Sequence, residues 1–567
     1  MVPVPSCSGT RHQLESSVSD LRVGRSAASG HDWTVNFSSD QTMNSQLTAY
    51  DIVPYTGHAL AQAHPDRLAT IATLFGMKPA EITRARMLEL GCGDGLNLTS
   101  VALSLPGAEC IGIDRAAAGI RKGQERAQVL GLDNVELRQL DIMDVGESLG
   151  RFDFIIAHGI YSWVPEAARD KLLAICKQNL ADNGVAYVSY NTYPGGHMRD
   201  MAREMMRFHV SEFDDPKQRV TQARSLIKFI IDAGSEPDLY RMVLQKELDR
   251  ITEFADSSLF HDDLSEYNAP VYFYQFVEHA GRHGLKYLSE AHFFEIQTGI
   301  FPGRIVEVLN RISDSAIAKE QYLDFLKCRR FRQTLLCHDD RELDDTPRPE
   351  KVTTFYIASP IRPADANACL DSRDQLTFSG PKNSSLQTDN PLIKAAMSAL
   401  GKAWPKAIHF QELLAQACGL CESPSSCATA GANDDARTLG EVLLRAYAGG
   451  IVEFSLAPPN LVTSAGLKPM ASALARLQSL EGAEVVNLRH FNLRVEDSLT
   501  RRLLQLLDGS RDRSALLDGL EVSTKSGDAA VEIKNGASTD NAETRCFLAV
   551  ALERKLAELA EMGLLVA

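Results

Sequence analysis

Three short apolar runs lie between Met87 and Asp141, and small or acidic residues follow each of them. They read MLELGCGDG (87–95), ECIGID (109–114) and NVELRQLDI (134–142). Short apolar runs that are bounded by turn residues are typical of the buried strands of a parallel sheet. The carboxyl ends of such strands meet at one edge, where ligands bind. The sequence therefore predicts a site for a nucleotide-like ligand at this edge.

The glycines after the first run favour a particular ligand. Gly91, Gly93 and Gly95 let the backbone turn sharply and approach a ligand closely, because glycine has no Cβ. The residues from Leu96 to Leu105 have helical spacing, and the N–H groups that begin a helix attract carboxylates. The methionine end of S-adenosylmethionine (SAM) carries a carboxylate. The spacing GxGxG is neither the GxGxxG of a dinucleotide fold nor a P-loop, so a phosphate ligand is the weaker interpretation. A purely structural turn is the alternative for the glycines alone.

Acidic residues close the next two runs. Asp114 follows the glycines by about twenty residues, where a carboxylate can accept both ribose hydroxyls. Asp141 is placed to accept from the adenine amino group, with Ile142 covering the ring. Together these positions predict SAM as the cofactor. The further candidates for cofactor binding are Tyr55, Glu89, Asp94, Asn97, Arg115 and His158.

ELGCGDG matches the first motif of class I SAM-dependent methyltransferases, which the stretch from Tyr50 to about Val210 resembles. More specific segments resemble methyltransferases that carry a methyltransferase regulatory domain: DIVPY (51–55), HPDRLATIATLFG (64–76), HGIYSWVP (158–165), SYNTYPGGHMR (189–199) and HDDLSEYNAPVYFYQF (261–276). The best understood branch contains bacterial protein-lysine methyltransferases that act on outer-membrane proteins, as in rickettsiae. The resemblance is strong over about 50–340 and faint beyond. It implies a homodimer and a protein substrate such as an outer-membrane or surface protein.

The length and the charge limit the other possibilities. At 567 residues the chain exceeds what one hydrophobic core supports, so roughly three or four domains are expected. A formal net charge of -15 argues against a nucleic-acid partner, because binding to phosphates depends on Lys and Arg. No apolar run is long enough to insert into a membrane, and the N-terminus lacks the apolar core of a signal peptide.

The cysteines favour a reducing compartment. The chain has 11 scattered cysteines without the dense spacing of a disulfide framework, which predicts a cytoplasmic protein. Cys418 and Cys421 form a CxxC with Cys427 nearby, and no second CxxC or histidine pair completes a zinc set with them. No metal site is therefore predicted.

The pattern along the chain predicts an α/β fold, a Rossmann-like doubly wound sheet followed by helical and C-terminal modules. The expected parts are a disordered leader (1–46), a SAM-binding methyltransferase domain (47–210), a helical methyltransferase regulatory domain (211–345), a strand and linker (346–390) and winged-helix-like α+β modules (391–567). The leader is rich in Ser, Gly and Thr, and a true start at Met43 would also explain it.

The residues after the fourth and fifth predicted strands are expected to line the site of methyl transfer. Sulfonium and alkylammonium groups are both attracted to aromatic ring faces. The alternative for Tyr161 and Trp163 is packing beneath the helical domain. For His261, Asp262 and Asp263, candidates for accepting a proton, the alternative is capping of a helix. The candidate catalytic residues are His158, Tyr161, Trp163, Asn191, Tyr193 and His261.

The sequence thus predicts an enzyme, a SAM-dependent methyltransferase that N-methylates lysine side chains of a protein. A methyltransferase for small molecules is one alternative, and a SAM-binding sensor without turnover is another.

Overall fold

A seven-stranded sheet forms the centre of the molecule. The structure is a computed structural model that describes residues 48–234, 238–420, 432–526 and 541–567, so the predicted leader and Met43 lie outside the described residues. The strand order is β3-β2-β1-β4-β5-β7-β6, and the first five strands in sequence are parallel. The strands are β1 Arg86–Leu90, β2 Glu109–Asp114, β3 Val135–Gln139, β4 Phe152–Ala157, β5 Leu180–Asn191, β6 Leu285–Glu290 and β7 Phe331–His338.

Helices cover both faces of this sheet, which confirms the predicted doubly wound α/β organisation. On one face the apolar side chains of α3 Pro65–Leu74 and α4 Leu96–Ser104 pack on β1, β4 and β5. On the other face α6 Glu166–Asn179 and α11 Phe273–Arg282 do the same. The other helical segments of this part are α2 Ala49–Ile52, η1 Ala61–Ala63, η2 Ile82–Arg84, α5 Ala117–Leu130, η3 Ile142–Asp144, η4 Glu147–Leu149 and η5 Tyr161–Trp163.

The sequence predicts a helical domain for the middle segment. The structure differs, because this segment also supplies two strands to the sheet. β7 pairs antiparallel with β5, and β6 pairs antiparallel with β7. Arg332 and Thr334 are buried polar residues in β7, which obscures the apolar pattern of a strand. The helical segments are α7 Gly196–Val210, α8 Pro216–Asp232, α9 Leu239–Glu253, α10 Asp256–Ser258, the π-helix η6 Leu259–Asp263, η7 Phe293–Ile296, α12 Gly303–Ile312 and α13 Ala316–Lys327.

Two further units follow the sheet in sequence. In the first, β8 pairs with β12 and β13, so the segment predicted as a strand and linker (346–390) contributes to this unit. That segment also contains β9, β10 and β11, which form a small sheet of their own. The elements of the first unit are η8 Pro349–Thr354, β8 Tyr356–Ala358, β9 Arg362–Pro363, β10 Leu376–Ser379, η9 Pro381–Asn383, β11 Ser385–Thr388, α14 Pro391–Ala403, β12 Ile408–His409, α15 Phe410–Leu420, α16 Ala432–Ala448 and β13 Glu453–Ser455.

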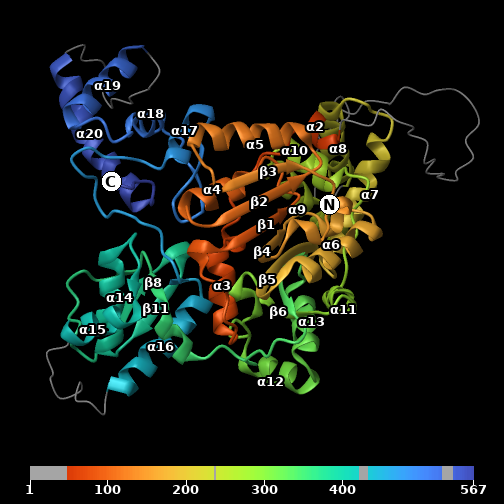
Figure 1. Cartoon of the computed structure of the whole chain (residues 1–567), viewed down its shortest axis with the longest axis horizontal. Helices are drawn as coiled ribbons and strands as arrows, with labels where there is room; N and C mark the ends of the chain where they lie inside the picture. Colours follow the sequence, from red (N-terminus) through yellow and green to blue (C-terminus); the bar gives the residue numbers. More distant parts are fainter. Residues whose placement is uncertain (1–47, 235–237, 421–431, 527–540) are drawn as a thin grey trace, which may run out of the picture.

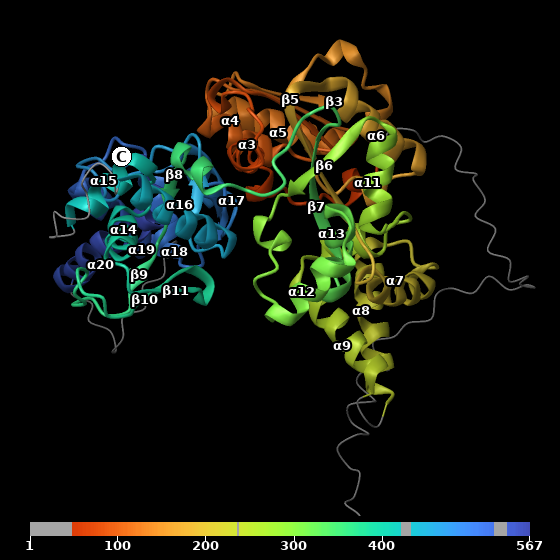
Figure 2. The same ribbon diagram turned by 90° about the horizontal axis from the view of Figure 1, so that it is seen from below.

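The second unit contains a two-stranded sheet and four helices among the described residues, with its own apolar core. Figures 1 and 2 show both units on one side of the central sheet, away from the helices α7 to α9. The elements of the second unit are α17 Ala473–Glu481, β14 Glu484–Val486, β15 Asn492–Arg494, α18 Ser498–Leu506, α19 Arg513–Ser526 and α20 Asn541–Glu561.

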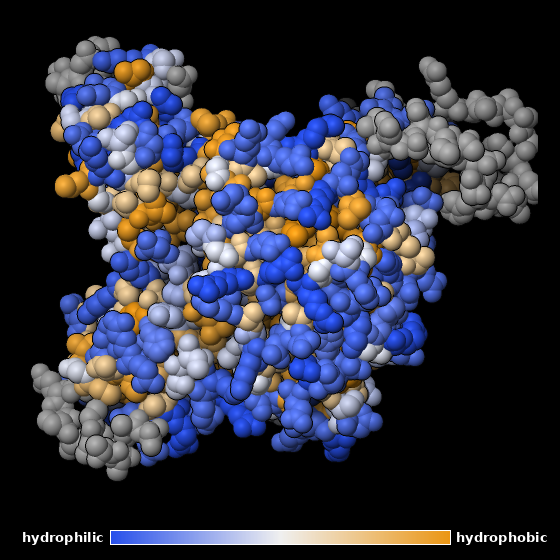
Figure 3. Space-filling view, viewed as in Figure 1, coloured by the Kyte–Doolittle hydropathy of each residue, from blue (hydrophilic) through white to orange (hydrophobic). Residues whose placement is uncertain are grey.

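Both C-terminal units dock on the central part through buried contacts. The carboxylate of Asp66 in α3 accepts hydrogen bonds from the Ser455 hydroxyl and the Leu456 backbone N–H of the first unit. Leu474 and Val486 of the second unit pack with Leu96 of α4. In Figure 3 polar residues dominate the face, and apolar residues gather over its centre and at the junction with these units.

Within the described ranges, no helix combines the length and the apolar character that a membrane crossing requires.

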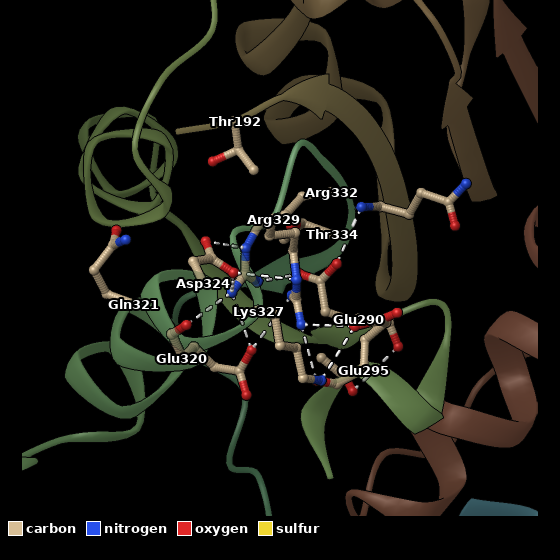
Figure 4. A network of polar contacts seen from close by, with 12 residues as sticks. Thr192, Glu290, Glu295, Glu320, Gln321, Asp324, Lys327, Arg329, Arg332 and Thr334 are labelled. Carbon is tan, nitrogen blue, oxygen red and sulfur yellow. Dashed lines mark hydrogen bonds and ion pairs between the residues drawn. The ribbon is translucent and has the colours of Figure 1, made fainter. Parts of the chain in front are cut away.

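A buried ionic cluster joins β6, β7 and α13 (Figure 4). The Arg332 guanidinium donates to Glu290 at 2.6 Å, to both carboxylate oxygens of Asp324 at 2.8 Å and to Glu320 at 3.1 Å. Its central carbon lies 3.7 Å from the centre of the Phe273 ring. Burial raises the pKa of Glu320 to about 7, which Arg332 opposes. Arg332 thus contacts three buried acids, and Arg329 adds an ion pair with Asp324 at 3.2 Å.

Replacement of this arginine should destabilise the sheet strongly. Arg332→Met removes the cation that contacts all three buried carboxylates and leaves only Arg329 near two of them, and we expect a loss of about 3–5 kcal/mol in the free energy of unfolding. Urea denaturation measures it. The control is Arg138→Met, which removes an ion pair with Glu136 of similar length, 2.6 Å, on the exposed surface. A loss below about 1 kcal/mol is expected there. Equal effects of the two substitutions would contradict the importance of the cluster.

Candidate cofactor site and active site

The glycine turn after β1 leaves room for a ligand. Gly91 and Gly93 adopt positive φ angles of 68° and 57°, which side chains other than glycine rarely adopt. A Cβ at Gly93 would meet no atom within 4 Å, whereas a Cβ at Gly91 would collide with Ile160. The backbone N–H of Gly93 donates to Asp114 at 2.9 Å. The turn is thus fixed to the end of β2, and the space beyond Gly93 is open.

The two acidic residues predicted to bind the nucleoside lie at neighbouring strand ends. Asp114 also accepts from the Ala116 N–H at 2.8 Å, and burial raises the pKa of Asp114. A carboxylate with two such bonds retains lone pairs for ribose hydroxyls. Asp141 accepts from the Met143 N–H at 2.9 Å and forms an ion pair with Arg115 at 3.1 Å. Ile142, directly after Asp141, begins the short helix η3. The predicted nucleoside residues are therefore brought together.

Glu89, at the end of β1, fits the amino group of the methionine part of SAM. Its side chain is 3% exposed, and both of its oxygens accept from the Asn97 amide at 3.2 Å. Burial, together with the carboxylates of Asp114 and Asp94, raises the pKa of Glu89 to about 8. A cation placed beside such an acid restores its ionised form. Glu89, Asp114 and Asp141 thus suit the amino group and the nucleoside of SAM.

The second C-terminal unit contacts this part of the site through His490. The Nε2 of His490 lies 2.8 Å from the Asn97 side-chain oxygen, which also accepts from the Leu60 N–H at 2.9 Å. The other ring nitrogen lies 2.9 Å from the Ser100 hydroxyl. Because the Asn97 oxygen only accepts, Nε2 donates and Nδ1 accepts from Ser100. His490 thereby fixes the amide that holds Glu89, and no local sequence pattern indicates this contact.

Asp94, also predicted to bind the cofactor, has other partners. It forms ion pairs with Arg126 at 2.8 Å and Lys122 at 3.4 Å and accepts from the Leu96 N–H at 3.1 Å. A Cβ at Gly57 would lie 2.0 Å from an Asp94 oxygen. Asp94 therefore fixes the glycine turn and the segment that passes over it.

That segment, residues 48–58, precedes the sheet in sequence and contacts both α5 and the π-helix η6. Asp51 accepts from the Ala118 N–H of α5 at 2.9 Å, and Tyr50 stacks on His261 with ring centroids 4.1 Å apart. His261 Nε2 donates to the Val53 carbonyl at 2.6 Å. Hydrogen bonds to Ser258 and Asp262 hold the Tyr55 hydroxyl. His261 thus anchors the segment, and its Nε2 is not available to accept a proton.

The three candidates after β4 have different surroundings. His158 Nδ1 lies 2.9 Å from the Tyr187 hydroxyl, and burial lowers the pKa of His158 to about 4, so the ring is neutral near pH 7. Tyr161 is only 2% exposed, and its hydroxyl lies 2.8 Å from His279 Nδ1 in the core beneath α11. Tyr161 therefore packs in the core beneath the regulatory domain, which is the alternative given for it in the sequence analysis above. Trp163 is half-buried, and its indole N–H has no acceptor among the described residues.

The candidates after β5 belong to a hydrogen-bonded chain. The Asn191 amide donates to Asn268 at 2.7 Å, and the Asn268 amide donates to Asp200 at 2.7 Å. The Tyr193 hydroxyl donates to the other Asp200 oxygen at 3.2 Å. The Tyr193 ring also stacks on His197 with centroids 3.9 Å apart. The sequence predicts Asn191 and Tyr193 as site residues. It does not single out Asp200, which directly follows SYNTYPGGHMR, or Asn268, which lies within HDDLSEYNAPVYFYQF.

The π-helix η6 presents two acids with different properties. Asp263 pairs with Arg199 at 2.7 Å and with Arg250 at 2.9 Å, and these cations hold the pKa of Asp263 below its usual range against the effect of burial. Burial and the neighbouring Asp263 raise the pKa of Asp262 to about 6, although Arg199 opposes this. π-helical turns are frequent at functional sites. Asp262 is thus a weaker acid than an ordinary aspartate.

Three family models match the chain. Residues 83–256 match a methyltransferase domain, residues 255–338 a predicted methyltransferase regulatory domain, and residues 468–564 the "PKMT, C-terminal winged helix domain". The fold and the site thus define a class I SAM-dependent methyltransferase, and SAM is its cofactor.

Rickettsial proteins are similar over most of the chain. An uncharacterized protein of Rickettsia prowazekii is 35% identical over 416 residues, which cover 71% of this chain and 74% of that protein. The structure of PKMT2 from Rickettsia typhi has a TM-score of 0.80 at 27% identity and covers 91% of this chain and 100% of its own. The same protein in complex with AdoHcy has a TM-score of 0.81 at 28% identity. The chain belongs to the family of SAM-dependent methyltransferases that carry a methyltransferase regulatory domain and a PKMT winged helix domain.

The substitution Glu89→Gln should change the stability of the protein and its affinity for SAM in opposite directions. The folded protein keeps the Glu89 proton up to about pH 8, and an unfolded glutamate loses it near pH 4.3. The free energy of unfolding of the cofactor-free protein therefore falls as pH rises through this interval. We expect Glu89→Gln to be more stable than wild type by roughly 2 kcal/mol at pH 8 and by less at pH 5.

The same substitution should weaken SAM binding by at least about tenfold, because the amide offers no charge to the amino group. Urea denaturation at both pH values and calorimetry with SAM measure the two effects. The exposed Glu125→Gln is the control and should change neither. A stability difference that is independent of pH would refute the assignment of a raised pKa.

Proposed function

We propose that this enzyme transfers methyl groups from SAM to lysine side chains of a protein substrate. The observation that carries the proposal is two pairs of an aromatic ring and a half-buried acid. The Tyr193 hydroxyl, just after β5, donates to Asp200, and the Tyr55 hydroxyl of segment 48–58 is hydrogen-bonded to Asp262 of η6. Aromatic faces and carboxylates both attract an alkylammonium group. The PKMT winged helix match and the likeness to PKMT2 support a protein substrate.

The proposed cofactor site uses the strand ends described above. Asp114 accepts from the ribose hydroxyls, Asp141 accepts from the adenine amino group, and Ile142 covers the ring. Glu89 pairs with the amino group of the methionine part. The N–H groups at the start of α4 face the methionine carboxylate, since the N-terminus of a helix favours an anion. Asp94, Asn97 and Arg115 act by holding these groups in place.

The proposed reaction needs alignment and one proton transfer. SAM supplies a methyl group on a positively charged sulfur. A lysine amine, with an ordinary pKa of about 10.4, must lose a proton before it attacks. Burial near the sulfonium charge lowers that pKa, because both effects disfavour the ammonium form. Asp262 is our candidate to accept the proton, since His261 Nε2 is engaged and His158 is a weak base.

An outer-membrane or surface protein is the substrate class that we propose. The cytoplasmic location and the homodimer stay predictions, which cell fractionation and light scattering of the purified protein can test.

The proposal can be tested with labelled SAM and purified bacterial outer-membrane proteins, with mass spectrometry to find methyllysine. Asn191→Ala should lower kcat by about a hundredfold through misalignment of the substrate while SAM affinity stays unchanged. Asp114→Asn should lose SAM affinity instead. The exposed Asn310→Ala on α12 is the matched control and should behave as wild type.

Other outcomes of this experiment would identify the alternatives. Transfer to a metabolite with no labelled protein would indicate a small-molecule methyltransferase. SAM binding without transfer to any acceptor would indicate a sensor.

The pH dependence should reveal the proton acceptor. If Asp262 takes the proton from a bound ammonium, kcat/KM rises with pH up to about 6 and then stays level, because the carboxylate form is needed. Asp262→Asn should lower activity at pH 8 by at least about a hundredfold. In that variant activity should keep rising toward the pKa of free lysine. A wild-type profile without a break near pH 6 would exclude this role of Asp262.

A further inference from the structure

A cluster of two histidines and one aspartate lies outside the cofactor site. Asp170 belongs to α6, His279 lies in α11, and His283 directly follows α11. Each residue offers one ligand atom, and these atoms all lie within 4.8 Å of one another. The cysteine motif around Cys418 is a different part of the chain, and its Cys421 and Cys427 lie outside the described residues. The two histidines of HAGRH (279–283) are not predicted as ligands from the sequence.

The spacing of the ligand atoms is close to that of a tetrahedral site. His283 Nε2 lies 2.9 Å from Asp170 Oδ1, and His279 Nε2 lies 3.4 Å from the same oxygen. In a tetrahedral zinc site with bonds of 2.0–2.2 Å, neighbouring ligand atoms are about 3.4 Å apart. The distance from His279 equals this spacing, and the distance from His283 is about 0.5 Å shorter, so a small shift of the exposed Asp170 side chain would admit an ion between the three groups.

Neighbouring groups orient one of these ligands. The Tyr161 hydroxyl lies 2.8 Å from Nδ1 of His279. A metal-bound histidine commonly donates its other N–H to an oxygen, which fixes the tautomer and the direction of the ring. His279 is 8% exposed and thus held firmly, whereas the Asp170 side chain is 61% exposed and leaves a direction open to water.

We propose that Asp170, His279 and His283 bind a divalent transition metal ion of the zinc class, with water as the fourth ligand. Imidazole and carboxylate ligands suit Zn²⁺. Such an ion would fasten α6 of the methyltransferase domain to α11 of the regulatory domain, which lie side by side in Figures 1 and 2. The nearby charges of Arg169 and Arg282 oppose a cation, so a micromolar affinity is expected.

The test is a titration of chelator-treated, tag-free full-length protein with Zn²⁺, and with Co²⁺ as a spectroscopic probe. We expect one ion per chain at this site and the visible absorption of tetrahedral Co²⁺. Asp170→Asn and His283→Gln should each weaken binding at least about tenfold. Cys418→Ser and Cys421→Ser are introduced into every protein, so that thiolates do not contribute to the titration.

Two controls isolate the cluster. His209→Gln removes a histidine of α7 that pairs with Gln222 and should leave metal binding unchanged. Asp114→Asn weakens SAM binding and should also bind Zn²⁺ as wild type does. Binding that is absent, or that survives His283→Gln and Asp170→Asn, would overturn the proposal. Slower hydrogen exchange in α11 upon addition of Zn²⁺ would support the fastening of α6 to α11, and unchanged exchange would refute it.

Discussion

The substrate region expected at the end of β5 depends on the pairing of β7 with β5. That pairing adds a strand from the regulatory domain to the methyltransferase sheet, and the Arg332 cluster holds it there by neutralising Glu290, Asp324 and Glu320. Asn191 lies at the last paired position of β5, opposite Phe331. The two domains are therefore one structural body at the place where the substrate is expected, and the regulatory domain is not an independent attachment.

The cofactor edge could be predicted from the sequence because its signals are local. A glycine turn and a carboxylate directly after a strand are adjacent in sequence to the strand that positions them, as for Gly93 and Asp114. The partners in the substrate region are remote instead. Asn191 meets Asn268, and Asn268 meets Asp200, across long stretches of chain. The spacing of apolar residues along the chain does not indicate contacts between residues so far apart in sequence.

Two other differences have specific physical reasons. The sequence does not predict β7, because Arg332 and Thr334 are polar residues at buried positions. Arg332 is satisfied by the ionic cluster, and Thr334 by Glu290 and Tyr190. Tyr161 is predicted to be catalytic because it follows the fourth strand and because an aromatic ring attracts cations. The short helix η5 turns its ring toward Phe276 instead, and proximity in sequence did not indicate the face.

The contact between His490 and Asn97 has a consequence for how the molecule can be divided. A fragment that ended after the regulatory domain would still contain every residue assigned to the cofactor, yet its Asn97 oxygen would lose one of its two donors and Ser100 its acceptor. The amide beside Glu89 could then rotate. The buried imidazole of His490 is therefore the contact that links the C-terminal half to the residue beside Glu89, so a protein truncated after the regulatory domain should not be taken as a minimal enzyme.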